Sequence, residues 1–359
     1  MAGSKPPTNP MKDTFAGFPV SLVSQRDICI SGIIATVHGL DELPTTITEV
    51  AVLWLLHPRL EKSKAMDPLG GMAISDWNER CKKNRDRVDK GLLAVSIDLR
   101  NHGRRQTHPV ANQVWRTGNP NHAMDLVAIC QGTASDVSLL IDHLPSYIFP
   151  SGNITITQHL CCGVSLGGHI TWQLFVGEPR ITVNIILLGC ADLGALLTDR
   201  ARLSKLPSYT NTTPPGDKFI GSQDFPRTLA IALRDIDATQ RIMSSAYGTS
   251  RRVTLEAEDQ QMRKSVMPER LRGKRLLVVS GGADKMAPYK LTSPVMEFLQ
   301  HTMGENSNRR HDGGLVMKSV VIPNVQHELT MEMVHEAVSF ALESVACVSS
   351  SSSQPVSKI

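Results

Sequence analysis

Gly163-Val164-Ser165-Leu166-Gly167 is the stretch that decides the fold of this chain of 359 residues. It fits Gly-x-Ser-x-Gly, in which a sharp turn from a strand into a helix lifts the serine hydroxyl clear of a sheet. A side chain two positions before or after the serine would collide with that turn, which explains the glycines. The flanking sequence fits this context, because residues 159–162 predict a buried strand and residues 168–175 predict the start of a helix. The pattern therefore indicates that Ser165 is a nucleophile.

Two later segments supply the partners that a nucleophilic serine needs. Residues 274–280 predict a buried strand, and the turn after it carries Asp284. Residues 315–322 predict another strand, and the loop after it carries His327. A neutral imidazole removes the serine proton, and a carboxylate holds the imidazole in the right tautomer and stabilises its charged form. We therefore expect Ser165, Asp284 and His327 to form a catalytic triad.

A second aspartate is an alternative for the acid. Asp192 follows the strand predicted at residues 181–188, in the stretch Gly189-Cys-Ala-Asp192. We favour Asp284, because its Gly-Gly-Ala-Asp turn ends a strongly apolar strand and triads are recognised by role and geometry.

With its elbow and the chain order Ser, Asp, His, the sequence resembles the α/β-hydrolases over residues 18–346. Residues 92–104 resemble the Asp-x-Arg-x-His-Gly turn of that fold, which implies structural roles for Asp98, Arg100 and His102. The resemblance implies an α/β fold, with a mostly parallel eight-stranded sheet, helices on both faces and a helical cap insertion.

Two short strings carry a narrower resemblance. Residues 54–60 (Trp-Leu-Leu-His-Pro-Arg-Leu) and Asp76-Trp77-Asn78 are similar to a group of filamentous-fungal hydrolases. That group includes hydrolases from the clusters that make host-selective toxins of Alternaria-type plant pathogens. The resemblance implies a role in secondary metabolism.

The sequence departs from the family at the oxyanion hole. The family usually has His-Gly after the third strand, but here His57 is followed by Pro58, which has no N–H to donate. We expect the N–H of Leu166, directly after the nucleophile, to be one donor. The second donor would come from Arg59 or Leu60, or from a loop that the sequence does not place.

Alternating strands and helices outside the middle of the chain predict how it is divided. The predicted parts are a flexible N-terminal arm (1–17), a hydrolase core (18–190 and 273–346), a helical cap (191–272) and a disordered Ser-rich tail (347–359). Within the core, we expect two strands in residues 19–37, a strand at 50–56 and helices at 77–90, 125–144 and 331–346.

The cap is expected to contain helices at residues 227–244 and 254–266 and to lie over the pocket. Leu229 and Leu233 would form an apolar ceiling, or they would only pack the cap onto the body. His57 and Met286 are expected to complete the substrate pocket.

Composition limits the class of partner. Hydrophobic residues make up 41% of the chain, which is enough for a large core, and a net charge of +4 with both signs interspersed argues against nucleic acid. No Cys/His cluster has zinc spacing, so no metal is expected. No apolar run approaches the length of a membrane span, and residues 1–19 lack a signal peptide, so we expect a cytoplasmic protein or a peroxisomal one. The peroxisomal expectation rests on Ser357-Lys358-Ile359, which differs from Ser-Lys-Leu in one residue and would bind the peroxisomal import receptor.

Together these features predict a serine hydrolase without a cofactor. Its substrate would be a small-molecule ester or thioester of an apolar acid. An acyltransferase with the same triad, and a ligand-binding scaffold without hydrolytic activity, are the alternatives.

Overall fold

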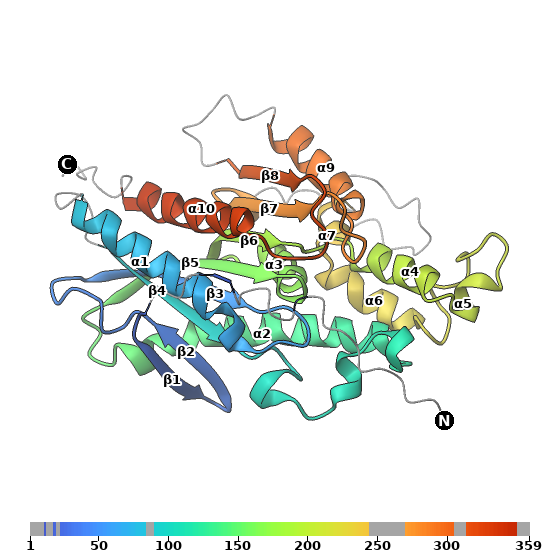
Figure 1. Cartoon of the computed structure of the whole chain (residues 1–359), viewed down its shortest axis with the longest axis horizontal. Helices are drawn as coiled ribbons and strands as arrows, with labels where there is room; N and C mark the ends of the chain where they lie inside the picture. Colours follow the sequence, from blue (N-terminus) through green and yellow to red (C-terminus); the bar gives the residue numbers. More distant parts are fainter. Residues whose placement is uncertain are drawn as a thin grey trace, which may run out of the picture.

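An eight-stranded sheet with helices on both faces forms the body of the protein (Figure 1). The computed structural model describes Met11 and residues 17–18, 22–83, 90–243, 270–304 and 314–349. The strands are β1 (Gln25–Ile30), β2 (Ile33–His38), β3 (Glu49–Leu56), β4 (Lys90–Ile97), β5 (Thr155–Val164), β6 (Ile181–Leu187), β7 (Arg275–Gly281) and β8 (Val316–Ile322). They lie in the order β1-β2-β4-β3-β5-β6-β7-β8, and only the β1–β2 and β2–β4 pairs are antiparallel. This confirms the predicted mostly parallel sheet.

The helices follow the strands in an alternating order. They are α1 (Asp67–Lys83), α2 (His122–Ile148), α3 (Leu166–Gly177), α4 (Leu193–Leu203), α5 (Pro207–Thr210), α6 (Arg227–Ile236), α7 (Ala238–Met243), α9 (Ser293–Gly304) and α10 (Met331–Ser349). Short 3-10 turns are η1 (Ser63–Met66), η2 (Gly103–Arg105), η3 (Pro109–Asn112), η4 (Trp115–Thr117) and η5 (Tyr289–Leu291).

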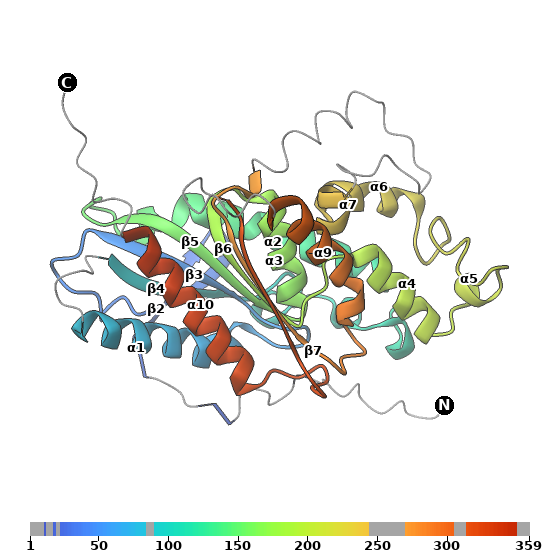
Figure 2. The ribbon, with the colours of Figure 1, turned by 90° about the horizontal axis from the view of Figure 1, so that it is seen from above.

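Each face of the sheet is covered by its own set of helices (Figure 2). The α1 and α10 helices pack on one face, while α2, α3 and α9 pack on the other. Cys161 and Cys162 of β5 show the alternation, because Cys161 joins the α2 and α3 side of the core and Cys162 joins the α1 and α10 side. Strands buried on both faces are expected to be mostly apolar. This holds for β3 after its first residue, Glu49, and for β4 apart from Lys90 and Ser96.

The helices expected at residues 125–144 and 331–346 are found a few residues longer, as α2 and α10, while two others differ more. The helix expected at residues 77–90 begins ten residues earlier, at Asp67, because its buried face uses apolar residues such as Leu69 and Trp77 that precede the charged run. Gly91 does not end this helix but lies inside β4, and residues 84–89 fall outside the described residues.

The helix expected at residues 227–244 is divided into α6 and α7 by Asp237. The Asp237 carboxylate accepts hydrogen bonds from the N–H groups of Leu193 and Gln240, so it holds a break between the two helices. The predicted helix at 254–266, and the tail at 350–359 with its terminal tripeptide, lie outside the described residues.

The α4, α5 and α6 helices, which belong to the described part of the expected cap, lie beyond the carboxyl ends of the strands (Figure 1). Four α4 residues and Leu233 of α6 belong to the same buried cluster as the residues of α2. The α4 and α6 helices are therefore packed onto the body, whereas α5 has no buried residue.

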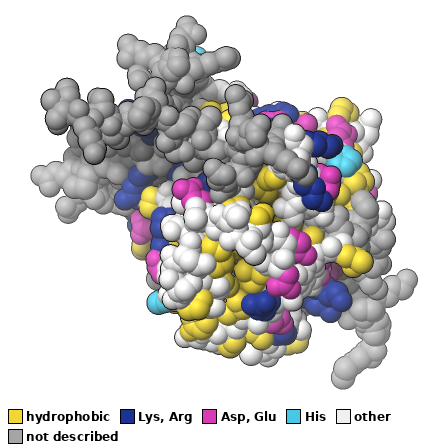
Figure 3. Space-filling view, turned by 90° about the vertical axis from the view of Figure 1, so that its left-hand side faces the viewer, with side chains coloured by type: hydrophobic (Ala, Val, Ile, Leu, Met, Phe, Trp, Pro, Cys, Tyr) yellow, Lys and Arg dark blue, Asp and Glu magenta, His cyan; other side chains and the backbone are white. Residues whose placement is uncertain are grey.

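The α2 helix is long and apolar enough, by length and composition, to cross a membrane. Core helices pass the same test, and more than half of its apolar window is buried against α3 and the sheet. We therefore regard α2 as a core helix. On the face seen in Figure 3, the described Lys and Arg side chains are interspersed with Asp and Glu side chains.

Candidate active site

The elbow at the end of β5 holds Ser165 in a strained backbone conformation. Its φ is 53° and its ψ is −107°, values that a residue with a side chain rarely adopts. A hydrogen bond of 2.8 Å from the Ser165 N–H to the Leu187 carbonyl anchors the turn to β6.

The two glycines are needed because backbone atoms crowd them. A Cβ on Gly163 would lie 2.1 Å from the Gly167 carbonyl oxygen, and a Cβ on Gly167 would lie 2.1 Å from the Leu56 carbonyl oxygen. Both contacts are with backbone, which cannot move aside as a flexible side chain would. The glycine pattern in the sequence therefore has a steric cause.

Ser165, His327 and Asp284 lie in one chain of hydrogen bonds. Ser165 Oγ is 2.7 Å from His327 Nε2, and His327 Nδ1 is 2.7 Å from Asp284 Oδ2. Because an ionised carboxylate only accepts, Nδ1 carries the ring proton and Nε2 is left to accept from the serine hydroxyl. All three residues are buried.

The Asp284 carboxylate is held ionised by its partners. Burial raises the pKa of this carboxyl, but the hydrogen bond and charge of His327, together with the N–H groups of Ala287 and Met286, outweigh burial and hold the pKa below its ordinary value. These two N–H groups donate to Oδ1 at 3.0 and 2.7 Å, so both oxygens of the carboxylate have partners.

Asp192, the alternative acid, has a different place. Its side chain accepts the N–H of Ala195 at 2.7 Å and caps the N-terminus of α4. It is Asp284, and not Asp192, that contacts the His327 ring.

The expected oxyanion donors belong to two elements, the start of α3 and the turn after β3. Leu166 is the first residue of α3, so its N–H has no carbonyl partner within the helix. Arg59 and Leu60 are the central residues of a turn closed by the Glu61 N–H and the Pro58 carbonyl at 3.3 Å, and Leu60 has a φ of 68°. That turn leaves the N–H groups of its central residues unused. The assignment of the second donor to Arg59 or Leu60 stays a prediction.

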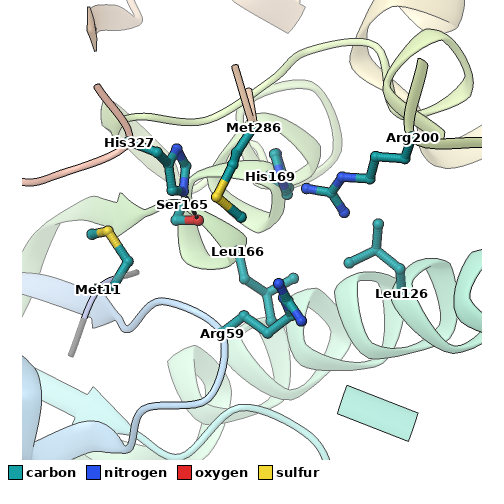
Figure 4. A pocket seen from close by; sticks show the side chains of 9 residues that line it. All are labelled: Met11, Arg59, Leu126, Ser165, Leu166, His169, Arg200, Met286 and His327. Atoms are coloured by element: carbon teal, nitrogen blue, oxygen red, sulfur yellow. Dashed lines mark hydrogen bonds between the residues drawn. The ribbon is translucent and has the colours of Figure 1, made fainter. Parts of the chain in front are cut away.

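A small pocket opens beside the serine (Figure 4). Its lining combines apolar side chains with basic ones: Met11, Arg59, Leu126, Ser165, Leu166, His169, Arg200, Met286 and His327. Met286 is therefore at the pocket, as expected. Met11 belongs to the predicted flexible arm, yet it is buried here.

Leu229, Leu233 and His57 were expected at the pocket but are not among the residues that line it. Leu233 is buried in the main core and Leu229 packs against that core, because α6 lies on α2, α3 and α4. Of the two uses weighed for these leucines, packing the cap onto the body is the one that the structure favours.

His57 is fully buried beneath the turn that follows β3. Its Nε2 accepts the Leu99 N–H at 3.0 Å, so Nδ1 carries the proton and donates to the Pro58 carbonyl at 2.7 Å. Burial, and then the neighbouring His102, lower the pKa of His57 to about 3. Both ring nitrogens are used within the protein, so His57 has none left for a substrate.

The turn after β4 has the structural role expected of it. Asp98 accepts N–H groups from Ser63 and Arg104. Arg100 forms a bidentate pair with Asp136 of α2, at 3.0 and 2.8 Å.

His169 and the side chains of Arg59 and Arg200 were missed in the sequence. Arg59 was expected to contribute only its N–H, and Arg200 stands in a run, Asp199-Arg200-Ala201-Arg202, that is typical of an exposed helix face. No signal in the sequence distinguishes Arg200 from Arg202. His169 lies one turn after Ser165 on α3, and this spacing could have indicated it.

His169 presents one ring N–H in the pocket. Its Nδ1 accepts the Cys190 N–H at 2.9 Å, so the proton of the neutral ring is on Nε2, which has no partner among the described residues. Burial, and then the charge of Arg200, lower the pKa of His169 to about 3, so the ring is neutral near pH 7. Among the residues that the structure describes, no group of three His, Cys, Asp or Glu side chains could hold a metal ion.

No protein-family model matches this sequence, and no curated protein sequence matches it either. Among solved structures, TT1662 from Thermus thermophilus is similar, with a TM-score of 0.52 and 16% identity over 90% of this chain and 98% of that one. A puromycin hydrolase is also similar, with a TM-score of 0.50 and 12% identity over 91% of this chain and 39% of that one. At these identities the likeness concerns the fold. Together with the strand order and the elbow at Ser165, it shows that the chain has the α/β-hydrolase fold.

Proposed function

We propose that this protein is a serine hydrolase that cleaves a small-molecule ester or thioester through an acyl-enzyme. The observation that carries the proposal is the chain of two 2.7 Å hydrogen bonds from Ser165 through His327 to Asp284 beside a pocket. A serine hydroxyl is a weak nucleophile until a neutral imidazole accepts its proton. The hydrogen bond to Asp284 holds the His327 ring in the tautomer that can accept it.

The three residues have distinct roles in the reaction. Ser165 Oγ attacks the carbonyl carbon while His327 Nε2 takes its proton, and the imidazolium then returns that proton to the leaving group. Asp284 orients the ring and stabilises its charged form. Water, activated by the same imidazole, attacks the acyl-enzyme and releases the acid.

The negative oxygen of the tetrahedral intermediate needs hydrogen-bond donors that are already in place. The Leu166 N–H, together with one N–H from the turn at Arg59 and Leu60, would meet this need despite Pro58. One oxyanion donor is typically worth about 10²–10³ in rate, so this turn has a large effect on how active the enzyme is.

The apolar side chains beside the serine favour an apolar acyl group. The pocket is lined by four apolar side chains, those of Met11, Leu126, Leu166 and Met286. The resemblance of residues 54–60 to fungal hydrolases supports a substrate from secondary metabolism.

Labelling with an alkyl fluorophosphonate probe tests the proposal. We expect one covalent adduct, located at Ser165 by peptide mass spectrometry and absent from Ser165→Ala. A matched control is Ser63→Ala, since Ser63 is also buried but has no histidine partner among the described residues and should leave labelling intact. Failure of the wild-type protein to label would favour the non-hydrolytic scaffold.

A further inference from the structure

Two arginines line the pocket, and their hydrogen-bond partners are a carbonyl and an imidazole. Arg59 Nη1 donates to the Asn112 carbonyl at 2.8 Å, and Arg200 Nη1 lies 3.3 Å from His122 Nε2. Among the described residues, no carboxylate forms an ion pair with either guanidinium. Asp199, the acid beside Arg200 in the chain, pairs with Arg202 instead.

The histidine that Arg200 contacts does not balance its charge. Burial, and then the charges of Arg200 and Arg59, lower the pKa of His122 well below its ordinary value, so this ring is neutral near pH 7. Among the residues that the structure describes, the hydrogen-bond partners of the two arginines are therefore neutral, a carbonyl and an imidazole.

Two buried guanidinium groups destabilise the folded protein unless an anion binds near them. Burial lowers the pKa of Arg59 to about 10, and the nearby Arg200 contributes to the shift. Burial also lowers the pKa of Arg200, and nearby acidic groups, the Asp284 carboxylate among them, offset only part of this shift. Both groups are still protonated at pH 7, so two like charges lie close together in a poorly solvated place. An anion between them would offset both the desolvation and the repulsion.

The position of the two side chains relates this anion to the reaction. Arg59 extends from the turn after β3 and Arg200 from α4, and both reach the same side of Ser165, next to His169 and Leu126 (Figure 4). A guanidinium is planar and offers paired N–H groups that match the two oxygens of a carboxylate. The Nε2–H of His169 is a third donor on this side of the serine.

We infer that Arg59 and Arg200 recognise a carboxylate carried by the acyl part of the substrate, a few atoms from the scissile carbonyl. The substrate is then a half-ester or half-thioester of a dicarboxylic acid, with its apolar chain against Leu126 and Met286. This inference rests on the proposed function and narrows its substrate class.

A pair of esters that differ in one charge tests it. Mono-4-nitrophenyl adipate carries the free carboxylate, and methyl 4-nitrophenyl adipate has the same chain with that charge removed. We expect the wild-type kcat/KM to be at least about tenfold higher for the free acid, because a hydrogen bond to a charged group contributes about 1.5–3 kcal/mol. Wild-type preference for the methyl ester would overturn the inference.

Variants of the two arginines locate the effect. Arg200→Met and Arg59→Met should each reduce the preference for the free acid, measured as the ratio of its kcat/KM to that of the methyl ester, by about 10- to 100-fold. The matched control is Arg202→Met, on the same helix but paired with Asp199 and half exposed, which should leave this ratio unchanged. Equal losses on both esters would show a structural role only. Arg200→Lys, which keeps the charge without the planar fork, serves if Arg200→Met does not fold.

A binding measurement separates this inference from the proposed function. Adipate should raise the melting temperature of the wild-type protein and slow its fluorophosphonate labelling, and it should do neither in Arg200→Met. Stabilisation by adipate in a protein that hydrolyses neither ester would keep the anion site and reject the hydrolase. Hydrolysis of both esters without any effect of adipate would keep the hydrolase and reject the anion site. Inorganic phosphate binding more tightly than adipate would overturn the choice of a carboxylate.

Discussion

Asp284 Oδ2 lies 2.7 Å from His327 Nδ1, and the other oxygen of the same carboxylate accepts two backbone N–H groups. The carboxylate is thus fixed by the loop that carries it, and it fixes the imidazole in turn. Asp284 follows β7, which pairs with β8, the strand before the loop of His327, whereas Asp192 follows β6 and caps α4.

Asp284→Asn should lower kcat/KM by about 10³–10⁴-fold, because an amide can donate to Nδ1 and stabilise the wrong tautomer. Asp192→Asn should leave activity and stability nearly unchanged, since asparagine caps a helix about as well as aspartate. Steady-state kinetics on one activated ester, with melting curves for both variants, checks this pair. A large loss of activity in Asp192→Asn would return that residue to the role of triad acid.

The glycine after the nucleophile gives a prediction about stability. Gly167→Ala forces a Cβ to within 2.1 Å of the Leu56 carbonyl oxygen and should cost at least about 3 kcal/mol of unfolding free energy. Gly194→Ala is the control, because its Cβ would meet only Asp192 Oδ1 at 3.4 Å. Within α4 that change should be neutral or stabilising by up to about 1 kcal/mol. Urea unfolding curves measure both, and a Gly167→Ala variant as stable as Gly194→Ala would contradict the crowding argument.

The parts of the site that are local in sequence could be predicted from it. The elbow, the turn with Asp284 and the loop with His327 each follow an apolar strand, and parallel strands bring their carboxyl ends to one edge of the sheet. The pattern of residues near each strand end was therefore enough.

The other side of the pocket could not be predicted, because it depends on how helices are placed. Arg200 and Arg202 are equivalent in the sequence, and only the docking of α4 on the body turns one toward Ser165 and the other to solvent. His57 shows the opposite error: a histidine beside the expected oxyanion turn proved to be used by backbone groups on both ring nitrogens.

Acid stability should depend on Glu178. Burial raises the pKa of its carboxyl, but a bidentate pair with Arg180, at 2.8 Å to each oxygen, outweighs burial and lowers the pKa to about 2. A carboxyl with a lowered pKa in the folded protein adds stability above its ordinary pKa near 4.5, and that stability is lost as the pH falls toward 2. Since Arg180 is partly exposed, we expect about 2 kcal/mol at pH 7.

Glu178→Gln should therefore lower the unfolding free energy at pH 7 and have a much smaller effect near pH 2.5. Glu79→Gln, which removes an exposed pair with Lys82, is the control and should show little change at either pH. Unfolding by urea at a series of pH values measures the difference. A Glu178→Gln effect that does not vary with pH would mean that packing, and not ionisation, is what the carboxylate supplies.

Truncation of two apolar side chains should separate packing from substrate contact. Leu233 is 4% exposed in the core beneath α6, so Leu233→Ala should cost about 2–4 kcal/mol of stability. It should not change the ratio of kcat/KM values for 4-nitrophenyl octanoate and 4-nitrophenyl acetate. Met286 lines the pocket, so Met286→Ala should lower that ratio by about tenfold, as lost apolar contact affects only the longer chain. If Leu233→Ala shifts the ratio as much as Met286→Ala does, α6 contacts the acyl chain, and the ceiling expected from the sequence would be the correct interpretation.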